Sequence, residues 1–184
     1  MATEFIQKVL NETRGQERSV SWFRKKIKEF GAPTSTKLIR EGKRSNNPFF
    51  GRLNMFFYSP KYKDKLPYYD RFPLVLPLEK NRGGFMGINM HYLPIPLRAE
   101  LLDKLYEFSS NDKFDNTTRL TATYNNVKNI DLVRPTLHRY LYNFVESQFR
   151  RIDANEFIVA TLLPVQRFKK ATDRKVWRDS RRMI

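Results

Sequence analysis

The chain has 184 residues, of which 40% are hydrophobic, and a formal net charge of +16 at pH 7, which suits one domain with its own core and a polyanionic partner. The absence of cysteine excludes disulfides, thiolate metal sites and cysteine nucleophiles, and two histidines cannot by themselves complete a usual zinc site. No apolar run reaches the roughly 18 residues of a membrane span, and the polar N-terminus is unlike a secretory signal, so we expect a soluble protein without a membrane partner.

Residues 1–50 are predicted to form a basic, helical N-terminal arm. The segment SVSWFRKKIKEFG, residues 19–31, has its large apolar side chains at helical spacing and ends at Gly31. The segment TSTKLIREGKRSNNP, residues 34–48, is predicted to be a short helix and then a loop that Pro48 ends. The candidate phosphate contacts of this arm are Arg24, Lys25, Lys28, Lys37, Arg40, Lys43 and Arg44.

Residues 51–165 are predicted to form a central α+β domain, because the apolar period changes to two from residue 51 onwards. The glycine-containing turn EKNRGG, residues 79–84, predicts a hairpin, and Gly87 is a candidate bulge in its second strand. The expected strands are 51–59, 72–78, 85–93 and 156–165. The predicted architecture is a small curved antiparallel sheet or SH3-like barrel covered by helices.

Three helices are expected after the hairpin. Leucines at helical spacing predict one helix over residues 96–108 and another over 134–149. The segment TDRKVWRDSRRMI predicts a basic helix capped by Thr172, within a C-terminal region of residues 166–184. The candidate phosphate contacts of this region are Lys169, Lys170, Arg174, Lys175, Arg178, Arg181 and Arg182.

The excess positive charge is concentrated at the two ends of the chain. Residues 1–66 carry a net charge of +9, residues 67–163 carry +1 and residues 164–184 carry +6. An ordinary globular centre with basic ends is typical of a protein that contacts nucleic acid phosphates. The alternative is a basic protein that docks on an acidic protein surface.

Motifs for catalysis are weak. A metal-dependent nuclease would need clustered carboxylates, and the short elements Glu41-Gly42-Lys43 and Asp173-Arg174-Lys175 lie in a polar loop and a basic helix. No serine or carboxylate is placed by sequence to form a triad with His91 or His138, which we interpret as structural histidines. The glycines of NRGGFMG lack the Lys-Ser/Thr ending of a P-loop. We therefore predict no catalytic residue, metal, cofactor or small-molecule substrate.

The stretch YYDRFP, residues 68–73, permits two interpretations. Tyr68 and Tyr69, like Trp22 in the N-terminal arm, could stack on bases, as aromatic residues beside cations do in single-strand binders. Packing at the end of the sheet explains the tyrosines equally simply and is the interpretation we favour. Asp70 is expected to cap a turn, with Arg71 covering the end of the sheet.

Three blocks of the sequence resemble small virion-associated proteins of T-even-like contractile-tailed bacteriophages. They are MFFYSPKYKDKLPYYDRFPLVLPLE, GGFMGINMHYLPIPLR and LLPVQRFKKATDRKVWRDSRRMI, and together they cover most of residues 50–184. Among these phage proteins, the DNA end protectors are the most compatible group. The resemblance implies a protein of the virion, present in the host cytoplasm during assembly, that shields the termini of the packaged genome from host exonuclease.

We therefore predict a non-enzymatic virion protein that binds double-stranded DNA, at the genome ends, through basic arms on a small β domain, and that contacts other virion proteins. The first alternative is a neck, tail or baseplate structural protein that docks on acidic protein neighbours. The second alternative is a metal-dependent nuclease.

Overall fold

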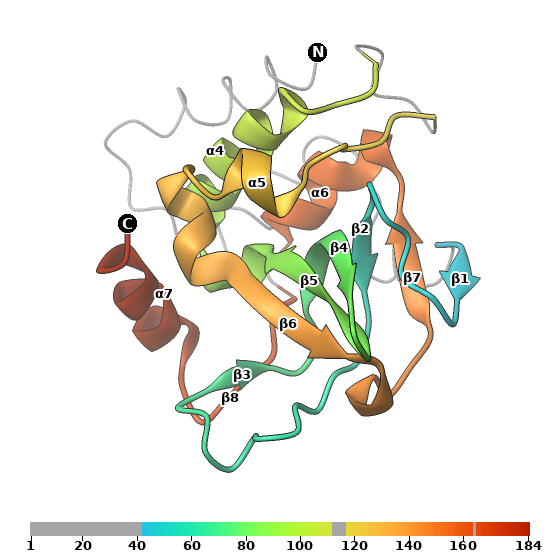
Figure 1. The fold of residues 1–184 in the computed structure, drawn as a ribbon. Coiled ribbons are helices and arrows are strands. Elements are labelled where there is room, and N and C mark those ends of the chain that lie inside the picture. Colours follow the sequence, from blue (N-terminus) through green and yellow to red (C-terminus); the bar gives the residue numbers. More distant parts are fainter. Residues whose placement is uncertain (1–41, 112–116, 164) are drawn as a thin grey trace.

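An open antiparallel sheet with helices on one face forms the centre of the computed structural model, which describes residues 42–111, 117–163 and 165–184 (Figure 1). The predicted helix at 19–31, and with it Trp22, Arg24, Lys25, Lys28, Lys37 and Arg40, lies outside the described residues.

The described chain alternates short strands with α-helices (α) and 3₁₀-helices (η). In chain order these elements are β1 (Arg44–Ser45), β2 (Leu53–Met55), β3 (Tyr69–Asp70), β4 (Leu74–Asn81), β5 (Gly84–Asn89), η1 (Met90–Tyr92), α4 (Ile95–Tyr106), α5 (Tyr124–Val127), η2 (Asp131–Thr136), β6 (Leu137–Leu141), η3 (Tyr142–Phe144), β7 (Phe149–Ile152), η4 (Ala154–Glu156), α6 (Phe157–Leu162), β8 (Phe168–Lys169) and α7 (Asp173–Arg181).

The main sheet has six strands in the order β1-β7-β2-β4-β5-β6, and every neighbouring pair is antiparallel. The α+β class and the antiparallel sheet are therefore confirmed. The predicted barrel is wrong, because β1 and β6 lie at opposite edges and do not pair with each other to close the sheet. A second sheet of two strands, β3 and β8, lies below the main sheet in Figure 1 and brings residues 69–70 beside 168–169.

The predicted hairpin is confirmed as β4 and β5. Its turn needs Gly83, whose φ of 73° lies in the left-handed region. The bulge lies on β4, between Pro77 and Glu79, and Gly87 is the partner of Pro77 on the other strand. Close approach of β6 explains Gly84, because a Cβ atom there would collide with the carbonyl group of Tyr140.

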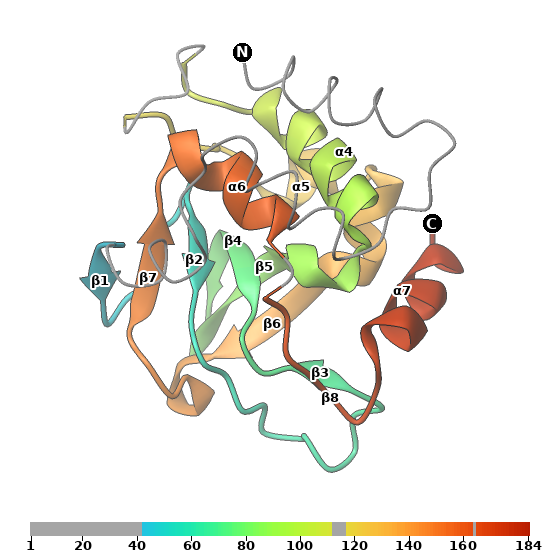
Figure 2. The ribbon, with the colours of Figure 1, turned by 180° about the vertical axis from the view of Figure 1, so that it is seen from behind.

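Side chains cover both faces of the main sheet. On one face, Leu53 and Leu76 pack with the leucines of α4 in an aliphatic core under the helices. On the other face, Phe56 and Phe85 belong to a core rich in aromatic rings, with ring centroids 6.2 Å apart. Seen from behind, α4 and α6 lie together over the sheet (Figure 2).

Two of the three helices expected after the hairpin are confirmed, as α4 and α7. The helix predicted over residues 134–149 is wrong: this segment forms η2, β6 and η3, followed by the start of β7. The strand predicted over residues 156–165 is also wrong, because residues 157–162 form α6. Both errors concern apolar segments whose spacing fits either structure.

Candidate nucleic-acid interface

Helix α7 and its C-cap residue expose four arginines, which we call the arginine stripe: Arg174, Arg178, Arg181 and Arg182. Their spacing of i, i+4, i+7 and i+8 places them on one face of the helix. Within the described part of the chain none of the four forms a salt bridge. Like charges at i, i+4 destabilise a helix, and Arg174 lies in the first turn, where the helix dipole also disfavours a cation. Arg178 and Arg181 lie in the last turn, where the helix dipole favours a cation, so helix stability accounts for these two arginines but not for Arg174.

The opposite face of α7 holds the helix firmly on the domain. Thr172 caps its N-terminus, with its side chain accepting from the backbone N–H of Lys175, as the sequence predicted. Val176 is fully buried, and the Trp177 indole donates a hydrogen bond from Nε1 to the His91 carbonyl, with an N–O distance of 3.0 Å. Lys175, one of the candidate phosphate contacts, forms an ion pair within the helix, with its ammonium 2.8 Å from the Asp179 carboxylate. The arginine stripe is therefore presented by a rigid element.

A buried network centred on Asp70 connects the elements beneath α7. Its carboxylate accepts from the backbone N–H groups of Phe72 and Arg167 and from the Asn89 amide, and lies 2.7 Å from His91 Nδ1. Burial alone would raise the pKa of Asp70, but His91 and the two backbone donors outweigh it and lower the pKa. The predicted turn cap is confirmed at Phe72, and the network is an addition that sequence reasoning missed.

Arg71 and both histidines have structural partners. Arg71 forms an ion pair with Glu146. His91 is completely buried, and burial lowers its pKa although Asp70 opposes this. Burial lowers the pKa of His138 to about 4, so this ring is neutral at pH 7. The interpretation of the histidines as structural agrees with these contacts.

The Lys170 side chain has a structural role within the protein. Its ammonium donates to the carbonyls of Lys63, Asp64 and Leu66, at 2.6, 2.9 and 3.1 Å. An ammonium group has three donors, so all of them are used. Lys170 therefore fixes the segment of residues 60–66, which we call the lysine loop, to the end of β8.

The lysine loop carries three exposed cations that the site prediction missed: Lys61, Lys63 and Lys65. They alternate with other residues around the exposed Tyr62, and the Lys61 ammonium lies 5.2 Å from the centre of that ring. Basic residues interleaved with an aromatic one are a known signal for nucleic-acid contact. The β3–β8 ribbon lies between this loop and α7, in both views (Figures 1 and 2).

A second basic group lies at the opposite side of the molecule. Arg44 on β1 is the cross-strand partner of Arg150 on β7, and Lys43 precedes it. Partial burial and then the charge of Arg44 lower the pKa of Arg150. Like charges directly opposite each other destabilise a strand pair. The structure thus separates Lys43 and Arg44 from the candidate residues on β8 and α7, since β1 and α7 lie at opposite sides in both views.

The two candidate stacking tyrosines have different surroundings. Tyr68 lies beneath α7, bonds to Asp179 and packs against Phe168 and Tyr92, with ring centroids 6.4 and 6.1 Å away. This arrangement favours the packing interpretation for Tyr68. Tyr69 is half-buried and is one of the residues that line a pocket beside the lysine loop.

The carboxylates do not assemble a metal centre in the described residues, where no three His, Asp or Glu side chains are grouped for one ion. Asp173, one of the carboxylates of the weak nuclease motifs, accepts a hydrogen bond from Gln166 at 2.8 Å. Glu41 lies outside the described residues. None of the helices in residues 42–111, 117–163 and 165–184 combines the length and hydropathy of a bilayer span.

The fold and its surface define a strongly basic α+β protein with rigid, exposed cationic faces, as is typical of proteins whose partner is a polyanion. The sequence matches the family of the Phage T4 terminal DNA protecting protein over residues 2–180. The chain therefore belongs to this family of phage DNA end protectors, which confirms the resemblance to T-even-like virion proteins. No curated protein and no solved structure shows significant similarity to the chain.

Proposed function

We propose that the protein binds the ends of the linear phage genome as duplex DNA and shields them from exonuclease by occupying them, without catalysis of its own. The virion is where it acts, after assembly in the host cytoplasm and in contact with other virion proteins. The observation that carries the proposal is the arginine stripe of α7, on a chain of the terminal DNA protecting family.

The stripe suits phosphates better than base edges. Its four guanidiniums follow one face of a helix, so they can contact successive phosphates along a strand. Lys169 and the cations of the lysine loop extend the positive surface beyond β8. Contacts of this kind release condensed counterions, so the affinity for DNA should depend steeply on salt.

The experiment compares two double variants with the same change in charge. Arg178→Gln with Arg182→Gln removes half of the stripe, and Lys128→Gln with Arg134→Gln removes two exposed cations outside it. Fluorescence anisotropy with a plain duplex measures affinity as a function of salt. The stripe variant should bind more weakly, and its salt slope should fall by about 0.9 for each phosphate that the protein no longer neutralises. The control variant should behave like the wild type.

Two results would redirect the proposal. If both double variants bind DNA as the wild type does, the arginine stripe is not the interface. If the wild-type protein binds a plain duplex weakly and without steep salt dependence, a structural protein that docks on acidic virion neighbours is the better account.

A further inference from the structure

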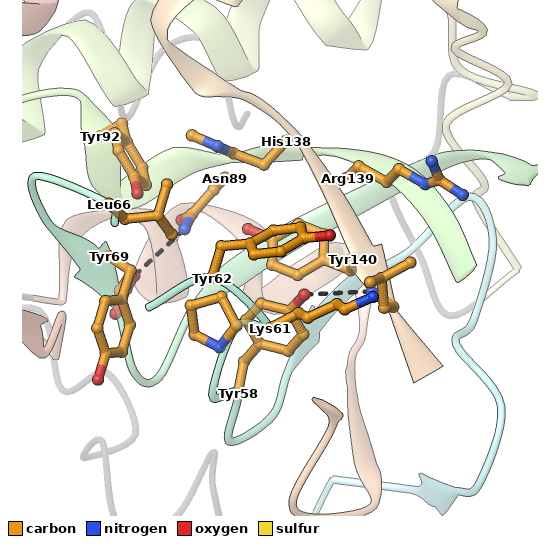
Figure 3. Close-up of a pocket in the computed structure, with 13 residues that line it drawn as sticks. Tyr58, Lys61, Tyr62, Leu66, Tyr69, Asn89, Tyr92, His138, Arg139 and Tyr140 are labelled. Atoms are coloured by element: carbon orange, nitrogen blue, oxygen red, sulfur yellow. Dashed lines mark hydrogen bonds between the residues drawn. The ribbon is translucent and has the colours of Figure 1, made fainter. Parts of the chain in front are cut away.

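A pocket of about 310 Å³ opens beside the lysine loop (Figure 3). Small-molecule sites commonly occupy about 300–1,000 Å³, so this pocket has room for a group the size of one nucleotide and not for a duplex. Its lining comes from the lysine loop and the preceding Tyr58, from the strands β3, β5 and β6, and from η1. Its lining residues include Tyr58, Tyr62, Tyr69, Tyr92 and Tyr140.

The interior walls of the pocket are aromatic and already fixed by the fold. The Tyr58 hydroxyl accepts from the backbone N–H of Leu141 at 3.2 Å, and Tyr140 is buried and bonded to Asn89. His138 is neutral at pH 7. The Asp70 carboxylate already accepts hydrogen bonds from the backbone N–H groups of Phe72 and Arg167. The interior therefore offers flat, uncharged rings without reorganisation.

The rim of the pocket is cationic. Lys61 belongs to the lysine loop, and Arg139 lies on β6, where it also donates to the carbonyl of Arg82 at 2.8 Å. Tyr62 is 57% exposed, although Lys170 holds the backbone of the loop that carries it. An apolar aromatic interior with cations at its mouth matches a neutral base joined to a charged phosphate.

We infer that this pocket binds one unpaired nucleotide at a DNA terminus, with its base among the tyrosines and its phosphate near Lys61 and Arg139. The inference rests on the proposed function, because it supplies the means by which a DNA end is distinguished from the interior of a duplex. Bases inside a duplex are stacked and paired, so only an end or a frayed segment can deliver one to the pocket at low cost.

The test uses three DNA molecules of equal duplex length. The first is a dumbbell closed by a hairpin at both ends. The second has one open end with three mismatched pairs, so that both strands carry unpaired bases, and the third has abasic sites at those unpaired positions. A fluorophore in the far hairpin reports anisotropy without entering the pocket. The wild-type protein should bind the second DNA about tenfold more tightly than the third, because stacking contributes roughly 1–3 kcal/mol per base.

Two variants distinguish the pocket from the arginine stripe. Tyr62→Ser changes an exposed ring and should remove most of the preference for unpaired bases over abasic sites. Arg178→Gln with Arg182→Gln should weaken binding of all three molecules and keep the preference. Arg139→Gln is a second pocket variant and should also reduce the preference. Thermal unfolding confirms that each variant is folded.

The outcomes separate the two proposals. Equal affinity of the wild type for unpaired and abasic ends would overturn the pocket inference, whatever happens with the stripe variant. A preference that survives both Tyr62→Ser and Arg139→Gln would also overturn it. A preference that depends on Tyr62, together with a stripe variant that binds like the wild type, would support the pocket and contradict the proposed role of the stripe.

Discussion

The Trp177 indole donates its hydrogen bond to the backbone carbonyl of His91, whose side chain lies against Asp70. The C-terminal helix is thereby connected to the buried polar network through one aromatic ring. Arg98, which is completely buried, lies beneath the same ring at 5.7 Å and donates to the carbonyls of Leu93 and His91. Removing α7 would therefore expose part of the core as well as remove charge.

The first prediction separates these two effects of α7. Trp177→Phe keeps the arginine stripe and an aromatic ring but loses the donor to His91, and it should lower the free energy of unfolding by about 1 kcal/mol. The Arg178→Gln, Arg182→Gln variant should leave unfolding almost unchanged and reduce DNA affinity. Denaturant titration and anisotropy measure the two quantities on the same samples. A Trp177→Phe protein that is as stable as the wild type would show that the hydrogen bond contributes nothing.

The second prediction concerns Lys170. Lys170→Met keeps most of the side-chain length but removes all three bonds to the lysine loop, so trypsin should cleave at Lys61, Lys63 or Lys65 faster than in the wild type. The salt slope of DNA binding should remain, because the Lys170 ammonium already has its partners within the protein. Lys169→Met, one residue earlier on β8, is the control and should leave the rate of loop cleavage unchanged. Equal cleavage rates in both variants would contradict the anchoring role.

The third prediction concerns acid. The pKa of His138 is lowered from its ordinary value of 6.5 to about 4, so the unfolded chain binds this proton more tightly than the folded one. Stability should therefore fall as the pH is lowered from about 6.5 to about 4, and burial of His91 acts in the same direction. The contribution of Asp70, whose pKa is also lowered, is lost only at still lower pH, below its ordinary value of 3.8.

Urea unfolding at several pH values measures this dependence. His138→Asn keeps a side-chain donor for the Pro135 carbonyl but does not titrate, and it should make stability depend less on pH across this window. Stability that rises on acidification, or an unchanged dependence in the variant, would contradict the assignment of His138 as a buried neutral ring.

The fourth prediction concerns the β4–β5 turn. Gly84→Ala places a Cβ atom against the Tyr140 carbonyl, where backbone would have to move, and should destabilise the fold by roughly 2 kcal/mol or more. Gly83→Asn is the matched control, since no atom lies within 4 Å of a Cβ built there and asparagine tolerates positive φ. Thermal unfolding of the two variants gives the comparison. Equal loss of stability at both positions would show that β6 does not approach Gly84 closely.

Sequence patterns predicted elements well where local chemistry is decisive. The hairpin has its glycine turn, and α7 has its Thr172 cap with a buried Val176 and exposed arginines. The pattern misled where an apolar run has no clear period: the segment of residues 157–162 is a helix, but its apolar sequence suits a strand equally well. In residues 134–149 the leucine spacing suggested a helix, but Arg139 and Tyr140 alternate between an exposed and a buried side of an edge strand.

The candidate site was predictable only in part. The sequence shows where charged residues lie along the chain, but it does not show which distant segments lie side by side in the fold. The arginine stripe was found from its local density of cations, whereas the lysine loop was overlooked although PKYKDK carries the same basic and aromatic signal. The use of Lys170 inside the protein depends on β3 pairing with β8, across about 100 residues. The pocket likewise depends on β6 lying beside β5, which the helix prediction excluded.

Protection by occupation of the DNA ends can be measured by exonuclease digestion of linear DNA beside the binding of circular DNA. Linear duplex and a covalently closed circle of the same sequence are incubated with the protein in separate samples. Binding to each DNA is measured, and an ATP-dependent exonuclease is then added to the sample that contains the linear form. We expect delayed digestion of linear DNA at protein concentrations that leave the circle largely unbound, with the delay abolished in the arginine-stripe variant. Equal affinity for linear and circular DNA, with no delay in digestion, would contradict this form of protection.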